Sequence, residues 1–273
     1  RYMDSPNQVP WQYIFGRGLT IFIILNLYLY FEEGIKFWKN YLKIGKSGIL
    51  GGCGLGIAMI SFIYSITNTT AAITLLCLAA MPFFTALLAF IFLKEQISLN
   101  VWISIVIATI GIIIMAFGNT EENSLVGFVF GITSSVGFSV FSITLRWRKE
   151  TPKFTTVAFA GLFCFIFATT VILFKGQVFF SSSYNSSLFS LHGTLVCLGL
   201  ILYSIGSKAI PAAELTLLSL TEVIGGIFWV WLPLFGINEI PDTNTVIGGF
   251  FLFISLFYYS LIMRWNKRYI GLN

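Results

Sequence analysis

Long apolar runs separated by short polar connections dominate this chain. A bilayer core of roughly 30 Å is crossed by about 20 helical residues, and nine runs of that kind can be placed along the sequence. Their approximate bounds are 10–31, 48–67, 70–93, 99–118, 125–147, 154–174, 190–208, 212–235 and 244–263. Short turns between long helices make consecutive helices antiparallel. The pattern therefore predicts an all-α, polytopic membrane protein with nine transmembrane helices.

Composition supports the same class of protein. Of the 273 residues, 57% are hydrophobic and 10% are charged, which is more apolar than a soluble domain needs. The net charge of +5 does not indicate a nucleic-acid partner, because the basic residues lie at the ends of apolar spans. The four cysteines lie inside apolar segments without metal-ligand spacing, and His192 is the one histidine. No catalytic motif is present, so we expect no enzyme, no metal and no cofactor.

The basic residues set the expected orientation in the membrane. When the spans alternate in direction, one side collects most of the cations: Lys36, Lys39, Lys43, Lys46, Lys94, Arg146, Arg148, Lys149, Lys153, Lys208, Arg264, Lys267 and Arg268. The other side keeps Arg1 and Lys175, and Arg17 lies within a span. By the positive-inside rule the first side is cytoplasmic, so the C-terminus lies inside and Arg1 outside. We expect a bacterial inner membrane protein, with one further N-terminal helix making ten in full.

Two long segments of the chain look like copies of each other. Residues 71–98 and 212–241 both open with Ala-Ala and close on a glutamate before a loop. Ala71 and Ala212 are related by a shift of 141 positions, and Glu95 and Glu239 by a shift of 144. A repeat at this spacing predicts two units, 1–120 and 121–273. With five helices in each full unit, the second copy is inverted relative to the first, as in many secondary transporters.

Four pieces of the sequence together resemble the EamA-type branch of the drug/metabolite transporter superfamily. They are WQYIFGRGLT at 11–20, AAITLLCLAAMPFFTALLAFIFLKEQIS at 71–98, IPAAELTLLSLTE at 210–222 and INEIP at 237–241. The resemblance covers the chain except for the absent first helix. It implies two inverted five-helix repeats around a central cavity, and transport of a small organic metabolite.

The sequence departs from the family's pattern at two places. Val223 stands where members often have a proline after the mid-helix glutamate, so we expect the kink at Gly225 and Gly226 or at Pro233. Leu-Lys-Glu at 93–95 stands where members more commonly have Leu-Gly-Glu, so Lys94 replaces a glycine. Both departures weaken any transfer of substrate identity from a relative.

Two carboxylates lie in the 212–235 span. Counted from Ala212, Glu222 is ten residues in, about 15 Å deep. An ionised carboxylate there costs on the order of 2.5–3.5 kcal/mol, so it is a candidate for function. The alternative is a protonated acid hydrogen-bonded between helices. Helical spacing places one mixed set on a shared face: Glu214, Leu218, Glu222, Gly226 and Trp229.

A second mixed face lies on the 70–93 span, beside the helix-breaking Pro82. It consists of Thr74, Leu78, Met81 and Thr85. The family's architecture implies that the two faces oppose each other across the central cavity.

Other charged residues have two interpretations each. Arg17 lies roughly 10 Å below the outer surface, where it either snorkels outward or pairs with a cavity carboxylate or an anionic substrate group. His192 is expected at the outer interface. Glu95 and Glu239, which end helices on opposite sides, are expected to be turn or gate residues.

The resulting hypothesis is a secondary transporter that moves a small organic metabolite, such as an amino acid, by alternating access. Its partners are the small-molecule substrate and the lipid bilayer, with protons as the candidate coupling ion and a homodimer as the candidate assembly. Glu222 either carries a proton or binds a cationic amine of the substrate. The alternative class is a membrane-embedded lipid-handling protein or enzyme. The proposed pathway residues are Glu222, Glu214, Arg17, Thr74, Met81 and Trp229.

Overall fold

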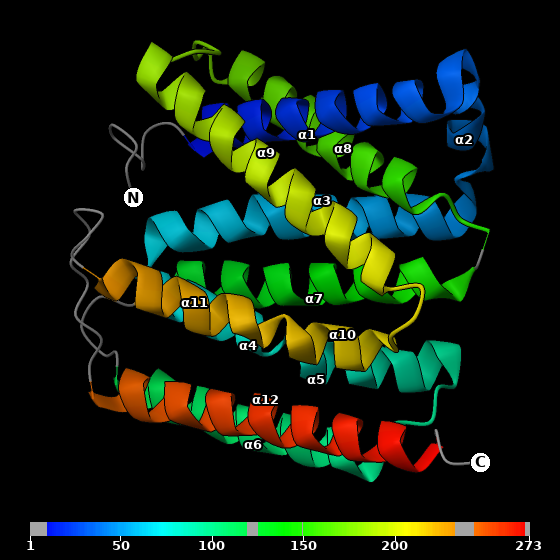
Figure 1. Cartoon of the computed structure of the whole chain (residues 1–273). Helices are drawn as coiled ribbons and strands as arrows, with labels where there is room; N and C mark the ends of the chain where they lie inside the picture. The colour runs from blue at the N-terminus through cyan, green and yellow to red at the C-terminus, as the bar shows by residue number, and fades with distance from the viewer. Residues whose placement is uncertain (1–9, 119–124, 149, 233–242, 271–273) are drawn as a thin grey trace.

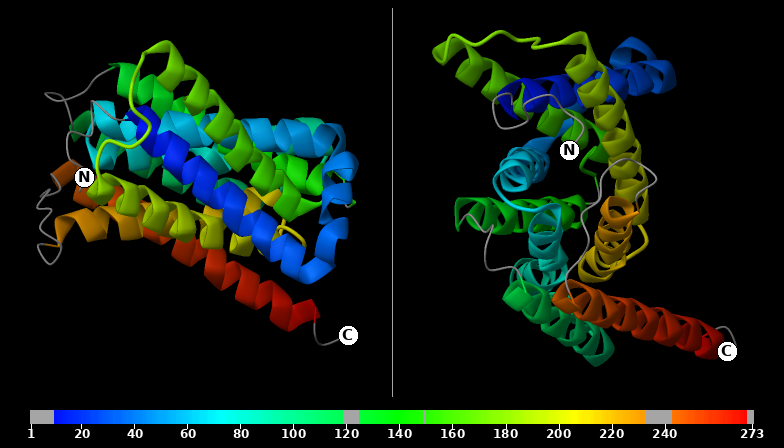
Figure 2. Two further views of the ribbon diagram at one scale, coloured as in Figure 1. Left: turned by 90° about the horizontal axis from the view of Figure 1, so that it is seen from above. Right: turned by 90° about the vertical axis from the view of Figure 1, so that its left-hand side faces the viewer.

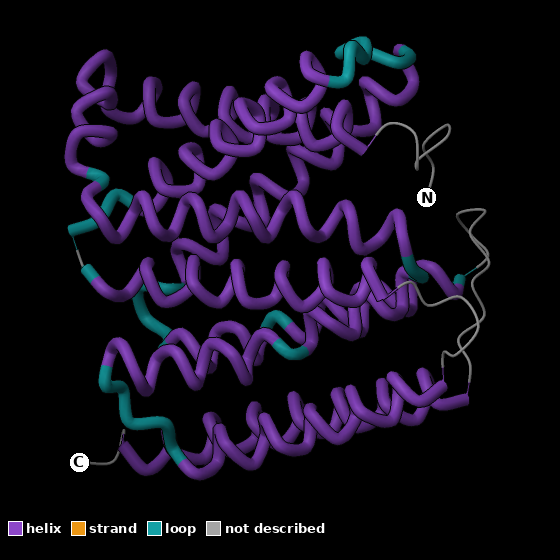
Figure 3. The backbone as a smooth tube through the Cα atoms, turned by 180° about the vertical axis from the view of Figure 1, so that it is seen from behind, coloured by secondary structure: helices purple, strands orange, loops and turns teal. Residues whose placement is uncertain are grey.

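The computed structural model of the chain describes residues 10–118, 125–148, 150–232 and 243–270. These residues form helices joined by turns and loops, with no strand among them (Figure 3). Seven helical segments are long and apolar enough to cross a membrane, and Leu99–Ile114 and Val246–Ile262 are shorter apolar helices. The all-α class is therefore confirmed for the described residues, and each of the nine predicted spans overlaps a helical segment, seven of them long and apolar enough to cross a membrane.

The helices follow one another along the chain without intervening domains. They are α1 (Pro10–Glu33), the 3-10 turn η1 (Gly34–Phe37), α2 (Trp38–Lys43), α3 (Gly45–Asn68), α4 (Ala71–Ala79), α5 (Met81–Leu88), the π-helical turn η2 (Ala89–Leu93), α6 (Leu99–Gly118), α7 (Leu125–Trp147), α8 (Lys153–Phe174), α9 (Ser183–Gly206), α10 (Ala212–Leu218), α11 (Leu220–Trp231) and α12 (Thr243–Ile270).

Two helix ends differ from the predicted bounds for local reasons. Helix α9 begins at Ser183, before the expected 190, because Ser182 caps it by accepting a hydrogen bond from the Asn185 amide at 3.0 Å. Helix α11 ends at Trp231 in place of 235. Leu232 is extended there, as expected for a residue that precedes a proline.

Two of the crossings are broken near their middles. Helix α4 ends before Ala80, and α5 begins at Met81 with Pro82 in its first turn. Helix α10 ends before Ser219, whose hydroxyl donates to the Thr216 carbonyl at 2.7 Å and competes with the helical ladder. The break lies at Ser219, ahead of the expected kink at Gly225 and Gly226, which both lie inside helix α11. Pro233 lies outside the described residues.

The helices pack in antiparallel pairs. Helix α3 lies along α7, α1 along α8, and α6 along α12. The broken helices cross so that α4 contacts α11 and α5 contacts α10. Figure 1 shows α1, α8 and α9 on one side of the bundle and α6 with α12 on the other, with the remaining long helices between them; the end-on view of Figure 2 agrees.

Small residues bring these helices close together. A Cβ built on Gly54 of α3 would lie 3.0 Å from the Gly137 carbonyl oxygen of α7, and one built on Gly137 would lie 2.6 Å from the Gly54 carbonyl oxygen. Such contacts let backbones approach within the membrane, where no hydrophobic drive brings helices together.

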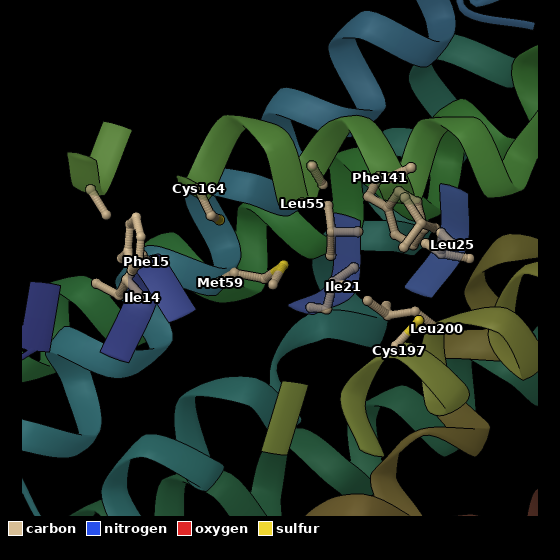
Figure 4. Close-up of a cluster of buried hydrophobic side chains, with 14 of the residues drawn as sticks. Ile14, Phe15, Ile21, Leu25, Leu55, Met59, Phe141, Cys164, Cys197 and Leu200 are labelled. Atoms are coloured by element: carbon tan, nitrogen blue, oxygen red, sulfur yellow. The ribbon is translucent and has the colours of Figure 1, made fainter. Parts of the chain in front are cut away.

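Buried side chains form two clusters. The first joins α1, α3, α7, α8 and α9 (Figure 4). The second joins α4, α5, α6, α10, α11 and α12. Phe138 of α7 and Phe62 of α3 pack against both clusters. The broken helices therefore belong to one body of packed side chains, and α1 with its neighbours belongs to the other.

Candidate functional site

Glu222 stands at the break in the second interrupted crossing. It is the third residue of α11, and its backbone amide donates to the Ser219 carbonyl at 2.9 Å across the break. The side chain is exposed, and within the described part of the chain its carboxylate has no hydrogen-bond or ion-pair partner. At about 15 Å from the start of α10, an exposed carboxylate faces either lipid or a polar space, and only a polar space tolerates its charge.

The other residues on the helix face that carries Glu222 are also less buried than their neighbours. Glu214, Leu218 and Gly226 are half-buried, and Trp229 is exposed. Leu217, Leu220 and Val223 lie on the opposite side of α10 and α11, in the second core cluster. The break at Ser219 divides the face, with Glu214 on α10 and Glu222 on α11.

Glu214 is held by a neighbouring helix. The hydroxyl of Tyr259, on α12, donates to Glu214 Oε2 at 2.6 Å. Glu214 also lies in the first turn of α10, where the helix dipole favours a negative charge. The two acids thus differ: Glu214 has a partner and a structural reason for its position, whereas Glu222 has neither among the described residues.

Thr74 and Met81 face the interior of the first half. The Thr74 hydroxyl shares hydrogen bonds with Ser65 Oγ at 2.9 Å and Thr69 Oγ1 at 3.2 Å. Met81 is 3% exposed, and its carbonyl accepts from Ser139 Oγ at 3.2 Å. Both residues therefore contact α3 or α7, and the structure does not bring their side chains to Glu222.

Arg17 is turned into the protein. Its side chain is 2% exposed, and Nη2 donates to the Met59 carbonyl of α3 at 2.6 Å. Its Nε atom has no hydrogen-bond partner, and no described carboxylate forms an ion pair with it. The snorkelling interpretation is wrong, because this hydrogen bond holds the guanidinium against α3.

A contact that the sequence did not predict lies one turn from Arg17. The Tyr13 hydroxyl and His192 Nδ1 are 2.5 Å apart, joining α1 to α9. His192 is nine residues into α9 and half-buried, so it is a helix-packing residue as well as a polar one. Tyr13 and Arg17 are spaced i and i+4 on one helix face, but no local pattern indicates the contact with His192, which lies 179 positions from Tyr13.

Arg146 joins three parts of the chain at the predicted cytoplasmic end. Its Nε lies 2.8 Å from Glu95 Oε1, and its Nη1 donates to the Ile210 carbonyl at 2.7 Å. Glu95 follows the first broken crossing, and Ile210 precedes the second. This gives Glu95 a contact with α7, and its role as a turn or gate residue stays a prediction. Glu239, its predicted counterpart, lies outside the described residues.

At the opposite end is a hollow of about 460 Å³. Its lining combines two aromatic rings with amide, hydroxyl and ammonium groups: Pro10, Trp11, Tyr64, Thr67, Asn68, Lys175 and Gln177. In the described ranges, no group of three or more His, Cys, Asp or Glu side chains is placed to hold a metal ion.

Comparison with known families supports a transporter relationship. The model of the EamA-like transporter family matches residues 3–117. Two proteins from two strains of Helicobacter pylori, each described as an uncharacterized transporter, are 28% identical over 144 residues. Each alignment covers 52% of this chain and 47% of the relative, so the match spans about half the length of those proteins. The resemblance to the EamA-type family is thereby confirmed.

The fold also matches a solved structure. One crystal structure, whose name states no function, aligns over 95% of this chain and 90% of its own with a TM-score of 0.74. Its sequence identity of 14% limits this likeness to the fold. The helical architecture described above is thus one that an experimentally determined protein also adopts.

Proposed function

We propose that this chain, whose residues 3–117 match the EamA-like transporter family, is a secondary transporter that moves a small organic metabolite by alternating access. Three observations support the proposal: helices of membrane-crossing length, relatives described as transporters, and two broken helices that cross at the centre of the bundle. Half-helices at a repeat interface are where secondary transporters place their substrate and ion sites.

The packing supports the two inverted units, 1–120 and 121–273. If α1 corresponds to α8 and α6 to α12, each of these helices lies against its own counterpart, as it would beside a two-fold axis. In the broken pair, the first half of one helix contacts the second half of the other: α4 with α11, and α5 with α10. A two-fold axis in the membrane plane produces this pattern. A two-fold axis along the membrane normal would instead bring the two first halves together and the two second halves together.

The proposed mechanism depends on Glu222. An unpartnered carboxylate beside a helix break, midway along a crossing, can take up a proton or bind a substrate ammonium when the pathway opens. In the first case protonation neutralises the group and couples flux to a proton gradient. In the second case Glu222 orients the substrate and no ion is coupled.

The other pathway residues have accessory roles in this proposal. Glu214, held by Tyr259, keeps its carboxyl group at the start of α10. Arg17 is a buried cation that reaches from α1 to α3, and among the described residues its Nε has no partner and can bind an anionic group of the substrate. Trp229 supplies an exposed aromatic surface on α11, the helix that also carries Glu222. Thr74 and Met81 support the first broken helix through their buried contacts.

The test begins with ligand identification. Full-length protein in detergent is screened by thermal shift against a metabolite library, because a bound ligand stabilises the folded state in proportion to RT ln(1 + [L]/Kd). Flux of each hit is then measured in proteoliposomes with and without an imposed pH gradient. Flux that requires the protein supports the transporter; binding without flux favours the lipid-handling or enzymatic alternative.

Glu222→Gln separates the two mechanisms, and Glu32→Gln is the control because Glu32 is an exposed acid at the end of α1. Proton coupling predicts that Glu222→Gln loses the response to the pH gradient. Ammonium binding predicts weaker substrate affinity and no gradient response in either protein. If Glu222→Gln transports like the control under both conditions, Glu222 is a packing acid.

A further inference from the structure

One guanidinium joins the ends of the two broken crossings. Arg146, in the last turn of α7, is hydrogen-bonded to the carboxylate of Glu95 and to the backbone carbonyl of Ile210. We propose that Arg146 is a latch that holds this end of the transport pathway closed, and that both of its bonds break when the pathway opens there. The inference rests on the proposed function and adds a gate to it.

The backbone before Glu95 is built in an unusual way. The first broken crossing ends in the π-helical turn η2, and Lys94 follows with φ 53°, in the left-handed region that favours glycine. The Glu95 amide then donates back to the Ala89 carbonyl at 3.3 Å. Single π turns occur often at functional positions. Here the turn and the left-handed residue direct the Glu95 carboxylate toward α7.

The second partner is a carbonyl left outside the helical ladder. Ile210 lies between α9 and α10, two residues before α10 begins at Ala212. Its neighbour Pro211 has no N–H group, and the first helical bond of α10 is accepted by the Pro211 carbonyl, from Leu215. The Ile210 carbonyl is therefore free to accept from Arg146 without breaking a helix.

Additional contacts close the same end. Lys153 Nζ donates to Ser207 Oγ at 2.9 Å, which ties the start of α8 to the end of α9. The hydroxyls of Ser47 and Thr151 are 2.5 Å apart, joining α3 to the connection before α8. The hollow beside Trp11 and Tyr64 lies at the other end of the bundle. The conformation is thus tied together at the Arg146 end.

The strength of the latch suits a gate that opens in every cycle. The side chains of Arg146 and Glu95 are 26% and 25% exposed, so solvent screens their attraction. A fully buried pair would be much harder to separate, because each ion would be left without its partner. Two bonds from one rigid guanidinium nevertheless define a single closed arrangement, which a lysine ammonium does not reproduce.

The test measures access to the pathway from the Arg146 end. A reporter cysteine is placed at Leu218, half-buried on the Glu222 face, in a background without the four native cysteines. Membrane-impermeant maleimide is applied to the side on which Lys43→Cys, exposed at the same end, is labelled. We expect Arg146→Gln and Glu95→Gln each to raise the labelling rate about fivefold, because loss of a solvent-screened ion pair shifts the equilibrium toward the open conformation by about that factor.

Arg148→Gln is the matched control, because it removes the same charge from an exposed position two residues away and leaves the latch intact. Arg146→Lys should fall between the control and Arg146→Gln. Glu95→Gln changes no side-chain volume, so it keeps the test valid if Arg146→Gln fails to fold. Unchanged labelling in Glu95→Gln, or an equal rise in Arg148→Gln, overturns the latch.

The measurement needs no substrate, which separates this inference from the proposed function. If the latch variants open the pathway but no solute is carried in liposomes, the transporter proposal fails and the latch stands as a conformational contact. If flux is found but the labelling rate does not change, the latch fails alone.

Discussion

Gly18 of α1 and Gly161 of α8 face each other reciprocally. A Cβ built on Gly18 would lie 2.8 Å from the Gly161 carbonyl oxygen, and one built on Gly161 would lie 2.9 Å from the Gly18 carbonyl oxygen. The shift from 18 to 161 is 143 positions, within the shifts of 141 to 144 that relate the repeated segments. A two-fold axis that exchanges the two units would pass between these glycines, which supports the inverted-repeat proposal.

The first prediction concerns this crossing. Gly161→Ala places a methyl group 2.9 Å from the Gly18 carbonyl oxygen and 3.0 Å from the Phe22 amide nitrogen. Both are backbone atoms, so the helices must separate. We expect a loss of about 1–3 kcal/mol, the usual range for overpacking, seen as a lower unfolding temperature in detergent. Gly199→Ala, on α9 with nothing within 4 Å of the added methyl, is the control; equal losses would contradict the prediction.

The second prediction concerns the support of Glu214. Tyr259→Phe removes the hydroxyl that donates to Glu214 Oε2 at 2.6 Å. A hydrogen bond to a charged group contributes about 1.5–3 kcal/mol, so we expect a clear fall in thermal stability. Tyr258→Phe is the control, since its hydroxyl is 3.5 Å from Asn100 Oδ1, at the limit of a hydrogen bond. The prediction is wrong if the two variants unfold together.

The third prediction separates structure from function at Arg17. The guanidinium is buried without a carboxylate partner among the described residues, and such a charge is costly to keep. Arg17→Met fills a similar volume without charge, so we expect stability to stay within about 1 kcal/mol of the parent or to rise. Flux of an anionic substrate should fall, with Arg17→Lys retaining more of it. Severe destabilisation of Arg17→Met would make Arg17 a structural residue.

The fourth prediction concerns Lys94. Its left-handed conformation, with φ 53°, costs an ordinary residue roughly 1–2 kcal/mol, which glycine avoids at some entropic cost. We expect Lys94→Gly to raise stability by about 0.5–1 kcal/mol. Lys94→Val should lower it, because a β-branched residue tolerates this region poorly. Thermal unfolding of the two variants gives the order, and a reversed order would refute it.

The fifth prediction concerns orientation in the membrane. Lys43 ends α2 and Lys175 directly follows α8, and both are exposed. Figure 1 shows these two helix ends at opposite ends of the bundle. The positive-inside rule places Lys175 outside and Lys43 inside, with the C-terminus cytoplasmic. In intact cells, impermeant maleimide should label Lys175→Cys, while Lys43→Cys should react only after permeabilisation. The opposite labelling pattern would invert the proposed topology.

Much of the fold could be predicted because membrane spans are local features of a sequence. The length of an apolar run is set by bilayer thickness, so the nine crossings could be placed without knowing their contacts. The interruption at Pro82 also follows from chemistry within the chain. The break at Ser219 cannot be predicted from the sequence, because serine competes with the helical ladder only when its hydroxyl turns back to a carbonyl, here that of Thr216.

The candidate site divides in the same way. The sequence by itself determined that Glu222 lies deep in a crossing, because depth is a count of residues along a helix. Only the tertiary structure decided that Glu214 has Tyr259 as a partner, that Arg17 donates to Met59, and that Arg146 reaches Glu95. Those contacts join residues 42 to 51 positions apart. A hydrogen bond needs its donor and acceptor atoms within about 3 Å of each other. That distance depends on how the helices are rotated and on how closely they cross at glycines, and no local sequence pattern encodes either one.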